Sequence, residues 1–381
     1  MHDGEKGLRD MSVLVGTRKG LFTVDRRGTG GNAGYRVVAT EFLGAPVTAI
    51  LDDQRDGTLY AALDHGHFGV KLHRREPGDT GFREIAVPEY PERPVDATDV
   101  NPMSNQPVPW ALQLLWTLAP GHAEQPGRLW AGTIPGGLFR SDDRGDSWEL
   151  VRSLWDRPER AGWMGGGYDW GGIHSVSVDP RDARALTVGV SIGGVWNSDD
   201  DGATWELGTG LRNSYLPPEQ AYDPGPQDPH RLDRCPADPD FVWCQHHNGV
   251  FRSTDGGRTF TEIEERPPST FGFAVAAHPH DPHTAWFVPA QADEQRIPVD
   301  GRMVVSRTRD GGASFDVLGT GLPDRHAYHL VYRHALAVDS TGDRLAMAST
   351  TGSLFVSDDA GDTWTHVTSG LPPAACVTWT D

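Results

Sequence analysis

The sequence contains few cysteines and no long apolar segment. Among its 381 residues there are three cysteines, Cys235, Cys244 and Cys376, and their spacing fits neither a zinc motif nor a disulfide framework. No apolar run approaches the length that a membrane helix needs. Residues 1–12 are polar and charged and lack the apolar stretch of a signal peptide. We therefore expect a cytoplasmic protein without a membrane partner.

Basic residues are scarce relative to acidic ones. The chain has 34 Lys and Arg against 53 Asp and Glu, which gives a formal net charge of −19. Proteins that bind nucleic acids need a basic surface, so we expect no nucleic-acid partner. The sequence also lacks a long segment with the apolar spacing of an amphipathic helix, and it contains no nucleotide or flavin motif. These absences favour an all-β protein without a nucleotide or flavin cofactor.

The chain does contain a short sequence motif that recurs, called the recurring phrase below. Its pattern is S/T-x-D-x-G-x-S/T-W/F, and the copies begin at Ser141, Ser198, Ser253, Thr308 and Ser357. A spacing of about fifty residues, with several short strands in each repeat, is typical of β-propeller blades. The Asp can accept backbone N–H bonds and the Gly can adopt a positive φ, as in a hairpin turn. We therefore predict that the phrase joins the third and fourth strands of each blade, and that its aspartates are structural.

Two further blades precede the first copy and lack the phrase. Their strands are predicted at 13–17, 20–24 and 35–38, and at 47–51, 58–63, 69–73 and 82–85. The first of these blades lacks an inner strand, which the C-terminal run 375–379 can supply, and such closure removes exposed sheet edges. We predict a flexible N-terminal segment at residues 1–11. Residues 12–381 are predicted to form a single seven-bladed β-propeller that is closed by the C-terminal strand.

Loops on one face of a propeller commonly carry its ligand site. On this face lie the turns between second and third strands and the connections between blades. The turns are 17–20, 64–69, 133–136, 191–194, 245–249 and 349–352, and blade six has a long insertion at 290–302. The connections 88–109, 154–173 and 211–229 are long and rich in Trp, Tyr and Pro. We therefore place the functional site at this mouth of the central channel.

Histidines are the main candidates for chemistry at the channel mouth. Neutral imidazoles from different blades suit a divalent transition metal, and imidazole is also the commonest general acid–base group. The candidate metal ligands are His65, His174, His230 and His246, and these four together with His67 are the catalytic candidates. His246 and His247 are adjacent, so in extended chain only one of them faces the pocket. The sequence leaves open which one does, and whether a metal is bound.

Cations gathered in an acidic protein form a local site for an anionic ligand. The candidate substrate-binding residues are Arg18, Lys19, Arg302, Arg333, His334 and Tyr328. We therefore expect an enzyme of hydrolase or lyase type that acts on a small polar or anionic substrate, with or without a metal. The alternative is a non-catalytic propeller that binds a protein or glycan. In the long loops Trp110, Trp155, Trp163 and Trp170 can either stack on sugars or form the packed core of the loops.

The recurring phrase resembles the Asp-box, or BNR repeat, of sialidases and related propellers. Further phrases occur at 64–69, 132–141, 166–169, 172–175, 228–231, 245–249, 299–302, 326–328 and 332–336. Through these phrases the whole chain resembles a family of bacterial BNR-repeat proteins that are labelled glycosyl hydrolase or exo-sialidase-like. The resemblance implies a seven-bladed propeller and adds a sialidase-like glycoside hydrolase as a further alternative.

A glycoside hydrolase needs two carboxylates that flank the sugar, and Asp64, Asp169 and Asp300 are the candidates on this face. Sialidases hold the carboxylate of their substrate with three arginines, and their Arg-Ile-Pro motif precedes the first box. Here Arg296-Ile297-Pro298 lies in the sixth predicted blade, so we assign it no such role.

Overall fold

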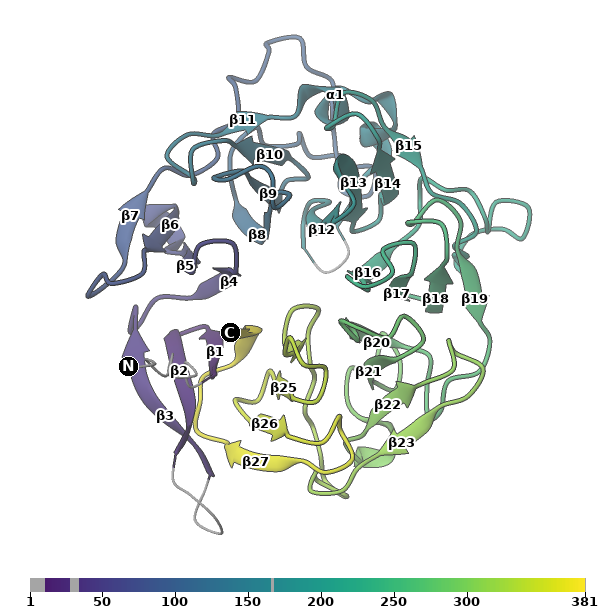
Figure 1. The fold of residues 1–381 in the computed structure, drawn as a ribbon. Helices are drawn as coiled ribbons and strands as arrows, with labels where there is room; N and C mark the ends of the chain where they lie inside the picture. The colour runs from purple at the N-terminus through teal and green to yellow at the C-terminus, as the bar shows by residue number, and fades with distance from the viewer. Residues whose placement is uncertain (1–10, 28–33, 166–167, 381) are drawn as a thin grey trace.

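The computed structural model describes residues 11–27, 34–165 and 168–380. It shows seven four-stranded antiparallel sheets arranged in a ring (Figure 1). The predicted all-β, seven-bladed propeller is therefore confirmed. Residues 1–10 of the predicted flexible segment, and positions 166 and 167 of one quoted phrase, lie outside the described residues.

The strands follow one another from the channel outwards in every blade. Blade 1 is β28 (Ala374–Thr380), β1 (Ser12–Thr17), β2 (Gly20–Arg27) and β3 (Gly34–Glu41). Blade 2 is β4 (Val47–Asp53), β5 (Thr58–Asp64), β6 (Val70–Arg75) and β7 (Arg83–Ile85). Blade 3 is β8 (Leu114–Pro120), β9 (Leu129–Ile134), β10 (Leu138–Ser141) and β11 (Glu149–Leu150). Blade 4 is β12 (Ile173–Asp179), β13 (Asp182–Val190), β14 (Gly194–Ser198) and β15 (Glu206–Leu207).

The remaining three blades repeat this order. Blade 5 is β16 (Pro229–Arg234), β17 (Val242–His246), β18 (Gly249–Ser253) and β19 (Thr261–Ile263). Blade 6 is β20 (Gly272–Ala277), β21 (Ala285–Pro289), β22 (Val305–Thr308) and β23 (Asp316–Leu318). Blade 7 is β24 (Leu336–Val338), β25 (Leu345–Ala348), β26 (Leu354–Ser357) and β27 (Thr365–Thr368). Short helical turns are α1 (Arg152–Trp155), η2 (Gly66–Phe68), η3 (Pro158–Gly162) and η4 (Val299–Gly301).

Blade 1 closes the ring with strands from both ends of the described chain. β28 pairs antiparallel with β1, with Ser12 opposite Thr380 and Val15 opposite Val377. In Figure 1 the yellow C-terminal strand accordingly lies beside the purple N-terminal strands. The inner strand that was predicted at 375–379 therefore occupies the expected place.

The recurring phrase forms the same hydrogen-bonded turn in each of its five copies. In the second copy Ser198 Oγ donates to Asp200 Oδ1 at 2.8 Å and accepts the Gly202 N–H at 2.9 Å. Asp200 in turn accepts the N–H and hydroxyl of Thr204 at 2.8 and 2.7 Å. Equivalent bonds recur in the copies that begin at Ser141, Ser253, Thr308 and Ser357. The structural role that was predicted for these aspartates is confirmed.

The hydrophobic core lies between neighbouring blades. The aromatic residue that ends the phrase contributes to it: Trp364 is 4 % exposed and packs with residues of blades 6 and 7. Trp205 packs in the same way with residues of blades 3 and 4. Burying aromatic area between sheets holds the sheets in place. The inner ends of the blades are thereby set at fixed positions around the channel.

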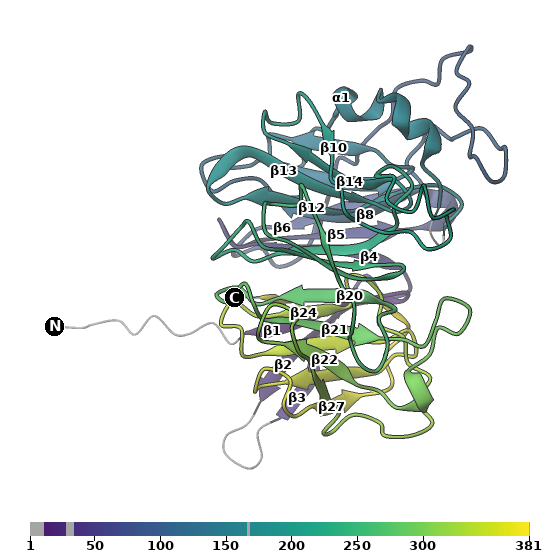
Figure 2. The ribbon, with the colours of Figure 1, turned by 90° about the vertical axis from the view of Figure 1, so that its right-hand side faces the viewer.

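One face of the ring carries the long loops. In Figure 2 the connection between β7 and β8 and the insertion that contains η4 both project on the right-hand side. This is the face on which sequence reasoning placed the site. No helix in the described ranges has the length and apolar character that would let it cross a membrane.

Candidate functional site

A pocket of about 220 Å³ lies at the mouth of the channel on the face with the long loops. Most of its lining residues come from the loops and first residues of inner strands, and the whole set is Arg18, Thr48, Leu114, Trp116, Tyr168, Phe273, Arg296, Tyr332, Arg333, His334 and Ala375. A larger cavity of about 810 Å³ continues along the channel and shares Trp116 and His334 with the pocket. The pocket is therefore the entrance to the channel.

Three arginines from different parts of the chain line this pocket. Arg18 follows β1 and is exposed, whereas Arg333 precedes β24 and is only 6 % exposed. Arg296, from the insertion between β21 and β22, pairs with Asp293. Burial lowers the pKa of Arg333, and the charge of Asp228 opposes this shift. Three guanidinium groups around a small cavity form a site for an anion, because each offers a fork of N–H donors.

The walls between the arginines are aromatic. The Arg333 guanidinium carbon lies 5.0 Å from the ring centre of Trp116 and 5.3 Å from that of Phe273. Tyr168 and Tyr332 complete the aromatic lining, with Tyr168 edge-on to Trp116 at 5.0 Å. Flat apolar rings beside hydrogen-bond donors suit a ligand with both apolar and polar faces, as a sugar ring has.

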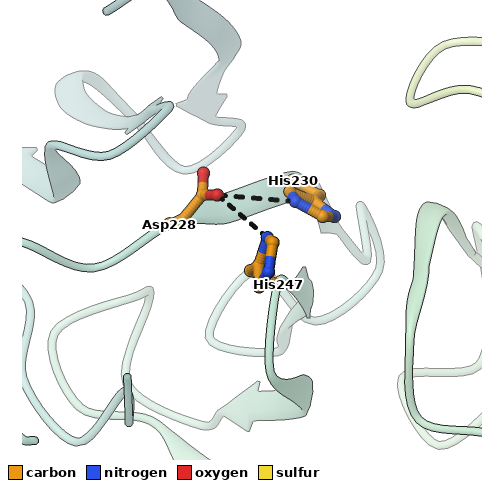
Figure 3. A group of neighbouring side chains, drawn as sticks. All are labelled: Asp228, His230 and His247. Atoms are coloured by element: carbon orange, nitrogen blue, oxygen red, sulfur yellow. Dashed lines mark ion pairs between the residues drawn. The ribbon is translucent and has the colours of Figure 1, made fainter. Parts of the chain in front are cut away.

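A cluster of one carboxylate and two imidazoles lies close to the pocket. Figure 3 shows the Asp228 carboxylate directed at both His230 and His247. Asp228 Oδ2 is 3.6 Å from His230 Nε2 and 3.3 Å from His247 Nδ1. Asp228 and His230 are buried, and the His247 side chain is 15 % exposed. It is the one group of metal-type side chains that converges in this way within the described ranges.

The local fold decides which of the two adjacent histidines joins this cluster. His246 ends β17 and points into the blade, where its Nε2 and Nδ1 lie 2.9 and 3.1 Å from the backbone nitrogens of Asp228 and Asn248. His247 is the next residue and therefore points the other way, toward the cluster. Of the two, the structure therefore brings His247 and not the predicted His246 to the Asp228 carboxylate.

Burial and mutual contacts set the charges in the cluster. Burial by itself disfavours ionisation of Asp228, but hydrogen bonds from His230 and His247 outweigh it and hold the pKa of Asp228 well below its usual range. Burial lowers the pKa of His230, although Asp228 opposes the shift. Burial also lowers the pKa of His246 to about 3. The carboxylate is thus charged and His246 neutral at physiological pH.

Two contacts and one charge interaction join the cluster to the pocket. Phe273, a pocket wall, stacks on the His230 ring with centroids 4.5 Å apart. Asp293, the partner of Arg296, has Oδ2 at 3.9 Å from His247 Nε2. The charge of Arg333 also helps to lower the pKa of Asp228. The arginine pocket and the Asp–His cluster are therefore parts of one site.

Several residues predicted from the sequence are not brought to this site. His65 and His67 lie at η2 in blade 2, where both are exposed, and the His67 ring contacts Phe68. Lys19 and Arg302 are exposed and do not line the pocket, and Tyr328 is 62 % exposed outside it. These five were predicted from the face on which their loops lie, but their side chains are exposed outside the pocket.

His174 and His334 are structural neighbours of the site. His174 is fully buried, contacts the Trp116 ring and pairs through Nδ1 with Ser175 Oγ at 2.9 Å. It lines neither of these two cavities, so the structure does not bring this predicted residue to the pocket. His334 does line the pocket, and its Nε2 donates to the His174 carbonyl at 2.7 Å. Of the predicted residues Arg18, His230, Arg333 and His334 thus lie at the site.

The predicted carboxylates and loop tryptophans have other roles. Asp64, Asp169 and Asp300 do not line the pocket, and Asp64 Oδ1 instead accepts the N–H of Gly66. Trp155 and Trp163 are buried in the cores between blades, which favours the interpretation that the tryptophans pack the loops. The aromatic residue that contacts the site from blade 3 is Trp116, on β8.

Sequence reasoning missed Arg296, Asp228 and Trp116. Arg296 was set aside because of its position in the sixth blade, yet the insertion folds back and places it at the pocket. Asp228 lies two residues before His230 in a quoted phrase, and residues two apart on an extended segment share a side. That spacing is the signal that could have identified Asp228.

Comparisons with known proteins agree on the architecture. No family model matches the chain. A xyloglucanase from Hypocrea jecorina is 27% identical over 258 residues, which cover 65% of this chain and 25% of the xyloglucanase. The chain thus matches about a quarter of the length of that relative.

Solved structures show the same fold. A structure of an ancestral GH74 enzyme has a TM-score of 0.57 at 15% identity, covering 87% of this chain and 38% of that one. YCF48 bound to a D1 peptide has a TM-score of 0.50 at 12% identity, covering 84% of this chain and 82% of that one. At these identities the likeness concerns the fold alone.

Proposed function

We propose that this chain is a hydrolase that cleaves a small glycoside carrying a carboxylate group. The observation that carries the proposal is the pocket of about 220 Å³ with three arginines and aromatic walls. The arginines Arg18, Arg296 and Arg333 bind the carboxylate, and the rings of Trp116 and Phe273 contact the sugar. The similarity to a glycoside hydrolase over 65% of the chain supports the reaction class.

Hydrolysis of a glycoside also needs acid–base groups at the bond that breaks. In place of the usual pair of carboxylates, the Asp–His cluster would supply them here. Asp228 is held ionised beside His247, which orients the imidazole and stabilises it when it takes up a proton. The cluster is adjacent to the arginines, so a bound sugar would have its reacting bond close to the imidazole. The substrate's anionic group thus fixes the position at which water attacks.

We also propose that the chain belongs with the Asp-box, or BNR, repeat proteins, because the same turn hydrogen bonds recur in five copies. The cysteines Cys235, Cys244 and Cys376 are free and buried. Free thiols are usual in a reducing compartment, which supports our proposal of a cytoplasmic location.

The test compares charged and neutral glycosides. We would assay 4-nitrophenyl glucuronide, a methylumbelliferyl sialoside and neutral xyloglucan oligosaccharides with the purified protein. We expect turnover of a carboxylate-bearing substrate only. Arg18→Gln should raise KM for it about 10- to 100-fold, the effect of losing one charge-assisted hydrogen bond. Lys19→Gln is the matched control, because Lys19 is exposed beside Arg18 but does not line the pocket.

Two results would overturn the proposal. Equal turnover of neutral xyloglucan oligosaccharides by the wild type and Arg18→Gln would show that the arginines do not select substrate. Tight binding of carboxylated sugars without turnover would instead establish the non-catalytic glycan-binding propeller.

A further inference from the structure

The spacing of the Asp228, His230 and His247 side chains matches the ligand spacing of a small metal ion. One ligand atom from each residue lies within 4.8 Å of the other two, and the two contacts to Asp228 Oδ2 are 3.3 and 3.6 Å (Figure 3). Bonds of about 2.1 Å in tetrahedral geometry place neighbouring ligand atoms about 3.4 Å apart. The cluster therefore needs only a small adjustment to surround such an ion.

The hydrogen bond on the far side of His230 turns its free nitrogen toward Asp228. Nδ1 lies 2.7 Å from the carbonyl oxygen of Gly272, which can only accept, so Nδ1 carries the proton. Nε2, which is 3.6 Å from Asp228 Oδ2, is therefore the ring nitrogen that a metal ion between the two side chains would contact.

His247 has an equivalent arrangement. Its Nε2 faces Tyr215 Oη at 3.3 Å and Asp293 Oδ2 at 3.9 Å, both of which can accept its proton. Nδ1 is the ring nitrogen directed at Asp228, at 3.3 Å from Oδ2. Histidines that bind metals generally donate their other ring nitrogen to a carbonyl or carboxylate in this way.

The carboxylate is oriented by the neighbouring blade. Asp228 Oδ1 accepts the Ile192 N–H at 3.2 Å and the Ser191 hydroxyl at 3.4 Å. This leaves Oδ2 to face the two histidines. All three side chains are therefore held by contacts outside the cluster, with one ligand atom of each directed inwards.

We propose that Asp228, His230 and His247 bind one divalent transition metal ion of the zinc class. Two imidazole nitrogens and one carboxylate oxygen form a typical ligand set for such ions, and three protein ligands leave a position for water. The charge of Asp228 and the net charge of −19 favour uptake of a cation. The proposal concerns the ion alone and does not depend on the substrate proposed above. With an ion bound, the metal site would activate water in place of the free His247 imidazole.

The experiment measures metal binding directly and uses no enzyme assay. The full chain is dialysed against a chelator and then titrated with Zn²⁺ by calorimetry and with Co²⁺ by visible absorption. We expect one equivalent of either ion, with the intense visible bands of a low-coordinate Co²⁺ site. Asp293→Asn, which removes an outer acceptor, should weaken binding about 10- to 100-fold. His247→Gln should weaken it further.

His67→Gln is the matched control, because His67 is an exposed histidine distant from the cluster. Thermal unfolding of each variant shows whether it is folded, and His247 is suited to substitution because its side chain reaches the surface. Absence of stoichiometric binding by the wild type, or binding by His247→Gln equal to that of His67→Gln, would overturn the proposal. Glycosides are absent from this experiment, so failure of the proposed substrate leaves its result unaffected.

Discussion

His230 and Phe273 lie face to face, with ring centroids 4.5 Å apart and an interplanar angle of 10°. The Phe273 ring also contacts the guanidinium groups of Arg296 and Arg333, at 5.4 and 5.3 Å from its centre. One aromatic side chain thus supports both the Asp–His cluster and the arginine pocket. A substitution of Phe273 should therefore alter ligand binding at both the cluster and the pocket.

Phe273→Leu should weaken two binding reactions together. Leucine keeps the apolar character of the position but lacks the flat ring on which the imidazole and the guanidinium groups rest. We expect affinities for Zn²⁺ and for a carboxylated sugar to fall about 5- to 10-fold each, the size of a lost cation–π or stacking contact. Calorimetry measures both, with Phe287→Leu, a buried change outside the pocket, as control. Equal affinities in the two variants would disprove the supporting role.

Ser198→Ala should destabilise the fold without affecting the site. The substitution leaves the buried Gly202 N–H without its acceptor and removes a hydrogen bond to Asp200. We expect the free energy of unfolding to fall by about 1–3 kcal/mol, measured by urea denaturation. Ala203→Asp changes an exposed position of the same turn and should stay within about 0.5 kcal/mol of the wild type. If Ser198→Ala leaves the free energy of unfolding unchanged, the turn does not need this hydroxyl.

His334 should make the fold sensitive to acid. Burial, together with the charge of Arg231, lowers the pKa of His334 to about 3 from an ordinary value of 6.5. Between these values the unfolded chain binds a proton that the folded chain does not, so stability falls as the pH decreases below 6.5. For this group alone, the free energy of unfolding should be about 2 kcal/mol lower at pH 5 than at pH 7. Urea denaturation at both pH values should show a smaller acid loss in His334→Gln, and an identical loss would contradict this assignment.

Gly16→Ala should loosen the strand pair that closes the ring. A Cβ atom at Gly16 would lie 2.5 Å from Cys376 Sγ and 3.0 Å from Val47 Cγ1, so β1 and β28 would have to move apart. We expect a loss of about 1–3 kcal/mol in the free energy of unfolding. Cys376→Ala removes the sulfur, and the double variant should therefore be more stable than the sum of the single changes predicts. If the losses of the two single variants simply add in the double variant, a clash between the new Cβ atom and Cys376 Sγ is not their cause.

The architecture could be predicted because it repeats. Each copy of the phrase fixes one hairpin by local hydrogen bonds, and five copies at regular spacing define five blades. The closing strand was predictable because blade 1 lacked an inner strand and the run 375–379 had no other partner. These inferences use residues close in sequence or a count of strands, and neither requires side-chain positions.

The site was predictable only in part, because it is assembled from distant loops. Arg18 was identified because it lies in the turn between the second and third strands of blade 1, and His230 and Arg333 because they lie at or beside the starts of inner strands. A propeller brings both kinds of position to the channel mouth. The conformation of the insertion that carries Arg296 is set by tertiary contacts, so the sequence did not show that Arg296 lies at the pocket. Alternation showed that one of His246 and His247 faces the site. Choosing between them requires the exact end of the strand, and strand ends cannot be predicted from sequence to within one residue.

The pairing of β28 with β1 has a consequence for how the chain could be rearranged. Because the first and last described strands are neighbours in one sheet, the seven blades have no structurally distinct beginning. A gene in which the two ends are linked and a new start is opened in an exposed connection elsewhere would encode the same ring. In such a circular permutant the blades would be synthesised in a different order but would form the same ring. The arginine pocket and its histidines should therefore form as they do in the original chain.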